Sequence, residues 1–294
     1  MINSIRTPEE RFANLPDWPY APNYLEWQGM RIHYIDEGAG ETILLLHGEP
    51  SWSYLYRKMI PSLAEKYRVI AFDWLGFGRS DKPTEVKDYS YDFHFKSFEH
   101  ILHALNLQDI TVVVQDWGGL LGLGMVGQKP ELFKRLVIMN TFIPNGHEKG
   151  SKAFNIWKSF ALNSPVLPIG RIISQGTYRP LDKAVRKAYD APFPSAKYKA
   201  GARSFPALVP MDPADPAVPY MNQARDVLGK WDKPCLVAFS DQDPIIGGAR
   251  GFFADLIPTA EGIPGKRVKD AGHFLQEDAG EEIASLILDF LARH

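Results

Sequence analysis

The run at residues 111–119, Thr-Val-Val-Val-Gln-Asp-Trp-Gly-Gly, constrains the fold of this chain more than any other stretch. Its β-branched start predicts a buried strand, and residues 120–128 have a composition typical of a helix. A sharp turn must join the two, with Asp116 at its apex. An aspartate at this position can cap the helix. Alternatively, it can act as a nucleophile, because a carboxylate is ionised at neutral pH without an activating base.

Strand-like and helix-like segments alternate along most of the chain. Units of this length predict a mostly parallel sheet covered by helices on both faces. We expect the first two strands to form a hairpin, and we expect residues 54–66 to be helical with a bend or restart at Pro61. The expected strands are 30–35, 42–46, 68–72, 111–114, 136–139, 235–239 and 267–269. The other expected helices are 92–107, 120–128, 220–228, 249–256 and 281–291.

The alternation stops between residues 143 and 213. This stretch has several prolines, no convincing strand, and helical pieces at 152–162 and 182–189. We therefore predict an α/β core formed by residues 1–142 and 214–294, with an all-helical cap at 143–213 inserted between them. An insertion that leaves and rejoins at the carboxyl ends of parallel strands covers the place where such sheets bind ligands.

Composition and charge exclude several classes of protein. The chain has 294 residues, a net charge of −2 and no basic run, so it lacks the electrostatic footprint of a nucleic-acid-binding protein. It has no run of eighteen apolar residues, and residues 1–24 lack the apolar core of a signal peptide. The single Cys235 excludes an internal disulfide and a cysteine-cluster metal site. We expect a cytoplasmic protein without membrane or nucleic-acid partners, and we expect a monomer.

Two more strand ends carry groups that Asp116 would need for catalysis. Residues 240–244 are Ser-Asp-Gln-Asp-Pro, and residues 270–274 are Asp-Ala-Gly-His-Phe. Nucleophile, acid and histidine then follow in the chain order that α/β-hydrolases use. A lone loop histidine would be a surface residue, but His273 follows a late strand, with Asp116 and an acid upstream of it. We therefore predict a catalytic role for His273.

The acid partner has several candidates. Asp241 and Asp243 both follow the same strand, and one of them can serve as a turn residue. We prefer Asp243, because Pro244 keeps the residue before it extended. Asn140 follows the preceding strand, at another position where an acid could stand, but it cannot carry the charge. Asp73 is also at a strand end, and we expect a structural role for it.

Four segments resemble those of the haloalkane dehalogenases, in the subgroup whose triad acid follows the seventh strand. They are His-Gly-Glu-Pro at 47–50, Val-Gln-Asp-Trp-Gly-Gly at 114–119, Asp243, and Asp-Ala-Gly-His-Phe at 270–274. The likeness runs from about residue 25 to the end and includes Ala-Pro-Phe-Pro at 191–194. It implies an α/β-hydrolase core with a helical cap, no cofactor and no metal. It also implies a small apolar halogenated substrate, hydrolysed with water to an alcohol, a halide and a proton.

The resemblance also implies roles for single residues. Asp116 would be the nucleophile, His273 the base and Asp243 its orienting acid, and Trp117 would bind the halide. His273 would deprotonate a water that attacks the Asp116 ester. In this fold the oxyanion hole uses the backbone N–H groups that correspond here to Trp117 and Glu49. The Glu49 side chain is unexpected beside a developing negative charge; contact with the Trp117 indole and positioning of a water are both open.

The halide needs hydrogen-bond donors that do not ionise, in a pocket poor in water. An indole N–H is only a donor, and Trp117 lies next to the nucleophile. Trp157 is the one tryptophan in the predicted cap, so it is the second halide-binding donor if the cap supplies one. The alternative is that Trp157 packs the cap against the core.

Three other functions stay open. Epoxide hydrolases share the fold but need a proton donor for the leaving alkoxide, for which the cap offers tyrosines. Fluoroacetate dehalogenases use arginines after the nucleophile, where this chain has Trp117 and Gly118. The third alternative is a small-ligand-binding protein of the same fold without catalysis. For the epoxide hydrolase alternative, the candidate proton donors in the cap are Tyr178, Tyr189 and Tyr198.

Overall fold

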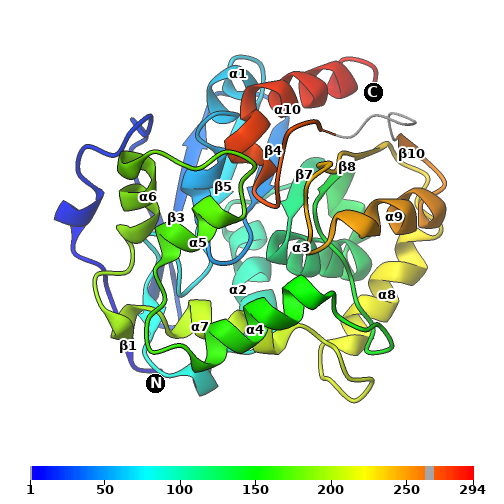
Figure 1. The fold of residues 1–294 in the computed structure, drawn as a ribbon. Helices are drawn as coiled ribbons and strands as arrows, with labels where there is room; N and C mark the ends of the chain where they lie inside the picture. The colour runs from blue at the N-terminus through cyan, green and yellow to red at the C-terminus, as the bar shows by residue number, and fades with distance from the viewer. Residues whose placement is uncertain (1, 262–267) are drawn as a thin grey trace.

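The structure, a computed structural model, describes residues 2–261 and 268–294. Among these residues an eight-stranded sheet has the order β10-β9-β8-β7-β4-β5-β3-β2 (Figure 1). From β10 to β5 all neighbouring strands are parallel, and β3 is antiparallel to both β5 and β2. The strands are β2 Asn23–Trp27, β3 Met30–Glu37, β4 Thr42–Leu46, β5 Arg68–Phe72, β7 Ile110–Gln115, β8 Phe133–Met139, β9 Cys235–Val237 and β10 Ala260–Glu261. A separate pair joins β1 Ser4–Ile5 and β6 Lys82–Pro83.

Helices cover both faces of the sheet, which confirms the predicted α/β architecture. Every residue of β4 and β7 is buried, as expected for parallel strands covered on both sides. In Figure 1, α1 and α10 lie above the sheet, and α2, α3 and α8 lie below it. No helix in the described ranges is long and apolar enough to cross a membrane. The core helices are α1 Ile60–Ala64, α2 Tyr91–Ala104, α3 Trp117–Gln128, α8 Val218–Leu228, α9 Arg250–Leu256 and α10 Leu275–Leu291.

The predicted hairpin between the first two expected strands is wrong. Strand β3 pairs with β2 and β5, whereas β4 pairs with β5 and β7. The hairpin that exists joins β2 to β3 through Gln28 and Gly29, which have φ values of 52° and 78°. Two-residue turns with positive φ at both positions match the twist of the flanking strands, and glycine is favoured at the second position. The Gln-Gly pair therefore marks this hairpin in the sequence.

Two other segments differ from their predicted boundaries. Arg267 of the expected last strand lies outside the described residues, and Val268 makes only an isolated parallel bridge to Ser240. The strand at the edge of the sheet is instead β10. The restart at Pro61 is confirmed, because a short 3₁₀ helix at Ser53–Tyr56 precedes α1, and Pro61 lies in the first turn of α1.

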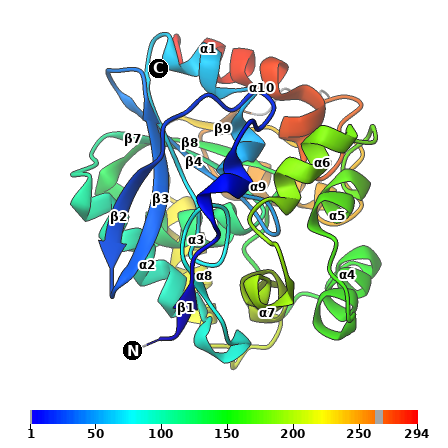
Figure 2. The same ribbon diagram turned by 90° about the vertical axis from the view of Figure 1, so that its left-hand side faces the viewer.

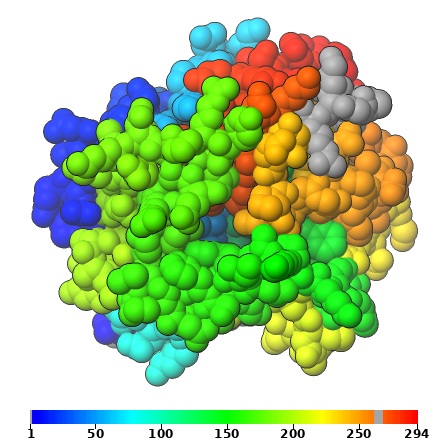
Figure 3. Space-filling model, in the orientation of Figure 1, coloured from blue at the N-terminus to red at the C-terminus, as the bar shows by residue number. Residues whose placement is uncertain are grey.

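Between β8 and α8 the chain, which is described throughout, forms helices and no strand. Figure 2 shows α4 to α7 together on one side of the molecule, away from the outer strands β2 and β3. In Figure 3 the same side faces the viewer, and a hollow opens at its centre. The cap helices are α4 Lys152–Asn163, α5 Ile169–Gln175, α6 Lys183–Asp190 and α7 Ala200–Leu208. The sequence patterns had indicated only α4 and α6.

A buried polar cluster fastens the cap to the core. Glu277, near the start of α10, accepts a hydrogen bond from the Tyr189 hydroxyl of α6. The same carboxylate accepts a hydrogen bond of 2.8 Å from the Arg57 guanidinium, so a buried charged pair and a neutral donor meet at one carboxylate. Removing one partner of such a buried pair leaves an uncompensated charge, so losing either partner strongly destabilises the folded protein.

Candidate active site

Asp116 stands at the junction of β7 and α3 in a strained backbone conformation. Its φ of 51° and ψ of −123° are sparsely populated for any residue with a side chain. The side chain makes no capping hydrogen bond to α3, so the helix-capping alternative is wrong. Instead Oδ1 accepts the backbone N–H of Glu49 at 2.7 Å. The carboxylate therefore lies over the end of the sheet and lines a cavity beneath the cap.

Two glycines make room for this turn. A Cβ on Gly48 would lie 2.4 Å from Cβ of Asp116, and a Cβ on Gly118 would lie 2.0 Å from the carbonyl oxygen of Leu46. Both distances are well below van der Waals contact. The first turn of α3 can therefore pack directly against the end of β4, which holds Asp116 and the Glu49 N–H together.

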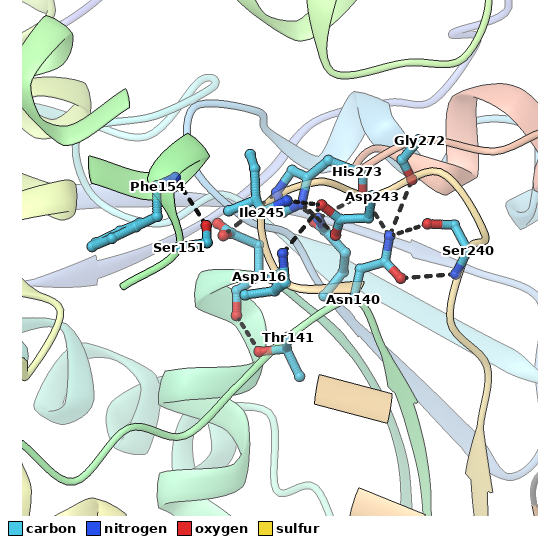
Figure 4. Close-up of polar contacts among 12 residues, drawn as sticks. Asp116, Asn140, Thr141, Ser151, Phe154, Ser240, Asp243, Ile245, Gly272 and His273 are labelled. Atoms are coloured by element: carbon cyan, nitrogen blue, oxygen red, sulfur yellow. Dashed lines mark hydrogen bonds and ion pairs between the residues drawn. The ribbon is translucent and has the colours of Figure 1, made fainter. Parts of the chain in front are cut away.

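His273 lies between the two carboxylates, as Figure 4 shows. Its Nδ1 is 3.0 Å from Oδ2 of Asp243, and its Nε2 is 3.6 Å from Oδ2 of Asp116. The other oxygen of Asp243 accepts the backbone N–H groups of Ile245 and Ile246, at 2.8 and 3.2 Å, which fixes its orientation. Asp241 instead accepts the N–H of Ala271 at 3.4 Å. Of the two candidate acids, the geometry pairs Asp243 with His273.

These charges control the protonation of His273. Burial alone would lower the pKa of this imidazole, but the carboxylates of Asp243 and Asp116 outweigh it and raise the pKa to about 10. Burial alone would raise the pKa of Asp243, yet the charge and hydrogen bond of His273 hold it below its ordinary value. With both carboxylates charged, the imidazole is therefore protonated at neutral pH. It can accept a proton only after one of the charges has been removed.

Asp116→Asn should therefore lower the pKa of His273. The amide keeps the shape of the side chain but removes the negative charge next to Nε2, and this charge favours the imidazolium form. NMR titration of the His273 ring protons would measure the change. Asp243→Asn should also lower the pKa, since that carboxylate is the largest influence raising it. An unchanged pKa in Asp116→Asn would mean that the two groups are not electrostatically coupled.

Two amide side chains support this arrangement, and the sequence did not indicate their roles. The Asn140 amide donates to Oγ of Ser240 at 2.7 Å and to the carbonyl oxygen of His273 at 3.2 Å, and its oxygen accepts the N–H of Ser240. The Gln115 amide donates to the same His273 carbonyl at 3.2 Å. Gln115 is the last residue of β7 and Asn140 directly follows β8, so a buried polar side chain at the end of a strand is the sequence feature that marks both.

The cavity under the cap has a volume of about 1110 Å³. Five of the predicted site residues line it, whereas Asp243 lies behind His273. Most of the remaining lining is apolar, as is usual for sites that bind small molecules. Within the described ranges, no group of three or more His, Cys, Asp and Glu side chains could hold a metal ion. The five predicted site residues that line the cavity are Glu49, Asp116, Trp117, Trp157 and His273.

The tyrosines that an epoxide hydrolase would need do not reach this cavity. No tyrosine in the described part of the chain lines it. Tyr178 is 48% exposed, and Tyr189 is buried with its hydroxyl on Glu277. Tyr198 is partly buried, with the ammonium of Lys197 5.4 Å from its ring centre. The proton donor for a leaving alkoxide is therefore lacking among the three candidates.

Asp73 has the structural role expected for it. Its buried carboxylate accepts from Nδ1 of His33 at 2.7 Å and from the backbone N–H groups of Ser53 and Arg79, both at 2.8 Å. Burial opposes ionisation, but the neighbouring His33 holds the pKa of Asp73 well below its ordinary value. Asp73 does not line the cavity and instead ties together the loops that follow β4 and β5.

Comparison with known proteins agrees with this geometry. Residues 41–164 match a family model described as the alpha/beta hydrolase fold. A haloalkane dehalogenase from Mycolicibacterium paratuberculosis is 48% identical over 98% of this chain and 98% of its own length. The chain belongs to the haloalkane dehalogenases. A second haloalkane dehalogenase, from Psychrobacter cryohalolentis, is 46% identical over 98% of this chain and 97% of its own length.

The fold agrees with that of haloalkane dehalogenases of known structure. The tetrameric structure of haloalkane dehalogenase DpaA from Paraglaciecola agarilytica superposes with a TM-score of 0.91, at 39% identity and with 97% of each chain covered. Haloalkane dehalogenases hydrolyse carbon–halide bonds, so the substrates of this enzyme are a halogenated alkane and water. The reaction of this enzyme therefore breaks a bond between a halogen and a carbon of the alkane.

Proposed function

We propose that haloalkane hydrolysis proceeds through an alkyl ester on Asp116. Oδ1 of Asp116 is held by the Glu49 N–H, so Oδ2 is the oxygen that attacks the carbon as its bond to the halogen breaks. The halide leaves with the bonding electrons, and no proton is needed in this step. The observation that carries the proposal is the Asp116 carboxylate itself, turned away from its helix into an apolar cavity and backed by His273.

The two indoles on the cavity wall are the proposed halide-binding groups. Trp117 is the first residue of α3 and lies beside the nucleophile, and Trp157 reaches the cavity from α4. Both can donate an N–H to the charge that develops on the leaving halide, and neither can lose its proton at neutral pH. The Trp157 side chain lies near the Glu49 carboxyl group, where it opposes the rise in the pKa of Glu49.

His273 is the proposed base for the second half-reaction. Formation of the ester removes the charge of Asp116 and lowers the pKa of His273, so the imidazolium releases its proton to solvent and the neutral imidazole can then accept a proton from water. The resulting hydroxide adds to the carboxyl carbon of the ester. As the tetrahedral intermediate collapses, the carboxylate of Asp116 is regenerated and the leaving alkoxide takes the proton from His273 to become the alcohol. The oxyanion forms on Oδ1, where the N–H groups of Glu49 and Trp117 can stabilise it. The N–H of Trp117, at the start of α3, has no acceptor within the helix.

The side chain of Glu49 is proposed to be neutral during this cycle. Its burial and the nearby charge of Asp116 raise the pKa of Glu49 well above the ordinary value, and the hydrogen bond from Trp157 only partly opposes this. A protonated Glu49 adds no repulsion beside the developing oxyanion.

Trp157→Phe should reduce the rate of halide release by about 10²- to 10³-fold, the usual cost of one lost donor to a transition-state charge. Phenylalanine keeps most of the ring, so stability should change little. Chloride and bromide should also bind the free variant more weakly, as measured by quenching of the remaining indole fluorescence. Trp27→Phe is a matched control, because Trp27 is also half-buried but packs on Phe93 outside the cavity. If Trp157→Phe keeps the dehalogenation rate and the halide affinity of the unmodified enzyme, Trp157 only packs the cap against the core.

We further propose that residues 143–213 act as the cap over this site, and that the enzyme works as a cytoplasmic monomer without a cofactor. The cap boundaries are supported by α4 to α7, which all lie within that range. Every proposed chemical step uses only side chains and backbone groups of this one chain. These groups come from both parts of the core and from the cap.

A further inference from the structure

The cavity is larger than the displacement reaction needs. At about 1110 Å³ it exceeds the range of roughly 300–1,000 Å³ that is common for sites binding drug-sized ligands. A methylene group takes up about as much space as a water molecule, ~30 Å³. A short haloalkane held at Asp116 would therefore leave most of the cavity unfilled. The remaining lining is mostly apolar and suits a longer hydrocarbon chain.

Helix α4 continues this apolar lining onto the outside of the molecule. Ile156 is 60% exposed and Phe160 is 40% exposed, although both also line the cavity. The same two side chains, one helical turn apart, border a shallow groove on the outer face of α4. Figure 3 shows α4 as the lower border of the hollow into which the cavity opens. Exposed apolar side chains grouped beside a cavity mark a surface that a ligand or partner covers.

We propose that this outer groove of α4 binds the alkyl tail of long-chain, terminally halogenated alkanes whose halogen-bearing carbon lies at Asp116. This inference rests on the function proposed above. A hydrocarbon tail is favoured as the occupant because the groove borders the substrate cavity and shares Gly150, Ile156 and Phe160 with its lining. The stem of Lys152, on the groove wall, can lie along the tail with its ammonium in water.

The proposal predicts how specificity depends on chain length. Each methylene buried against apolar side chains should raise kcat/KM by up to about fourfold, which corresponds to ~0.8 kcal/mol at ~1.4 kcal/mol per tenfold. The probes are ω-bromoalkan-1-ols with four to twelve carbons. Their hydroxyl group keeps the long members in solution and can remain in water at the open end of the groove. We expect kcat/KM, measured from bromide release, to rise through the longest members.

The variant Ile156→Ser with Phe160→Ser tests the groove. The ratio of kcat/KM for the twelve-carbon substrate to that for the four-carbon substrate should fall by at least about tenfold, the equivalent of losing roughly two buried methylenes. Leu162→Ser is the matched control, since Leu162 is 41% exposed on the same helix but borders neither the groove nor the cavity. Its ratio should equal that of the unmodified enzyme. Each of the two single serine variants should lower this ratio by less than the double variant does. The single variants keep the test usable if the double variant does not fold.

The outcomes separate this inference from the function on which it rests. If the four-carbon substrate is turned over and the ratio is the same in the double variant as in the unmodified enzyme, the groove does not bind the tail and the inference is overturned. Failure to release bromide at any chain length would overturn the ester mechanism and this inference with it. A ratio that falls in the double variant and stays unchanged in Leu162→Ser supports the groove as part of the substrate site.

Discussion

Asp116→Asn is expected to abolish halide release, with a loss on the order of 10⁴- to 10⁶-fold, as when a covalent nucleophile or its partner is removed from a comparable site. The amide oxygen is too weak a nucleophile to displace halide. The substitution should leave the fold intact, because asparagine tolerates a positive φ at least as well as aspartate. Halide release from 1-bromobutane, followed with an ion-selective electrode, measures the effect, and thermal unfolding checks the fold.

Asp241→Asn is the matched control for this experiment. Asp241 also lies at a strand end near the site, but its carboxylate accepts only a long hydrogen bond from the Ala271 N–H among the contacts that the structure describes. Its amide variant should retain most of the activity. Substantial halide release from Asp116→Asn, with intact-protein mass spectrometry excluding hydrolysis of the new amide, would rule out Asp116 as the nucleophile.

His273→Phe should release one halide per enzyme molecule and then stop. The first step uses Asp116 and the indole donors, so it can still occur, whereas no group remains to deprotonate the water that attacks the ester. Intact-protein mass spectrometry after addition of 1-bromobutane should show the mass of one butyl group added to the chain. Peptide mapping should place that group on Asp116.

His103→Phe provides the comparison, because His103 is exposed on α2 and does not line the cavity. It should turn over repeatedly and accumulate no adduct. If His273→Phe also turns over repeatedly and keeps an unmodified mass, His273 is not the base for ester hydrolysis. A variant that neither releases halide nor gains mass would instead place His273 in the first step.

The sequence predicted the parts of the fold that depend on local pattern. The β-branched run before Asp116 and the apolar periodicity of α10 each identify an element, because burial imposes a period on the side chains. It did not predict that β3 lies between β2 and β5, because the partner of a strand is set by contacts far away in sequence. The exposed residues of β2 also hid the true hairpin, since edge strands carry a weaker apolar pattern.

The site was predictable where a residue type has a chemical reason to be present. Asp116, Asp243 and His273 stand at strand ends in a recognisable order, and the structure brings these three side chains together. Asn140 and Gln115 were not predicted as supports, because an amide bears no charge or reactivity that a sequence pattern would reveal. The partners of Glu277 are even less visible, since Tyr189 and Arg57 lie 88 and 220 positions away.

The close packing of α3 has a consequence for the order in which the protein folds. Five of its twelve residues are glycines, each about 1 kcal/mol less favourable in a helix than alanine, so α3 cannot be stable by itself. It is helical because β4 and α8 hold it on either side, at distances that leave no room for a Cβ on Gly118 or Gly127. Since α8 follows the whole cap in the chain, we expect the turn that carries Asp116 to form only after distant segments have met. Catalytic activity should therefore be among the last properties that the folding chain acquires.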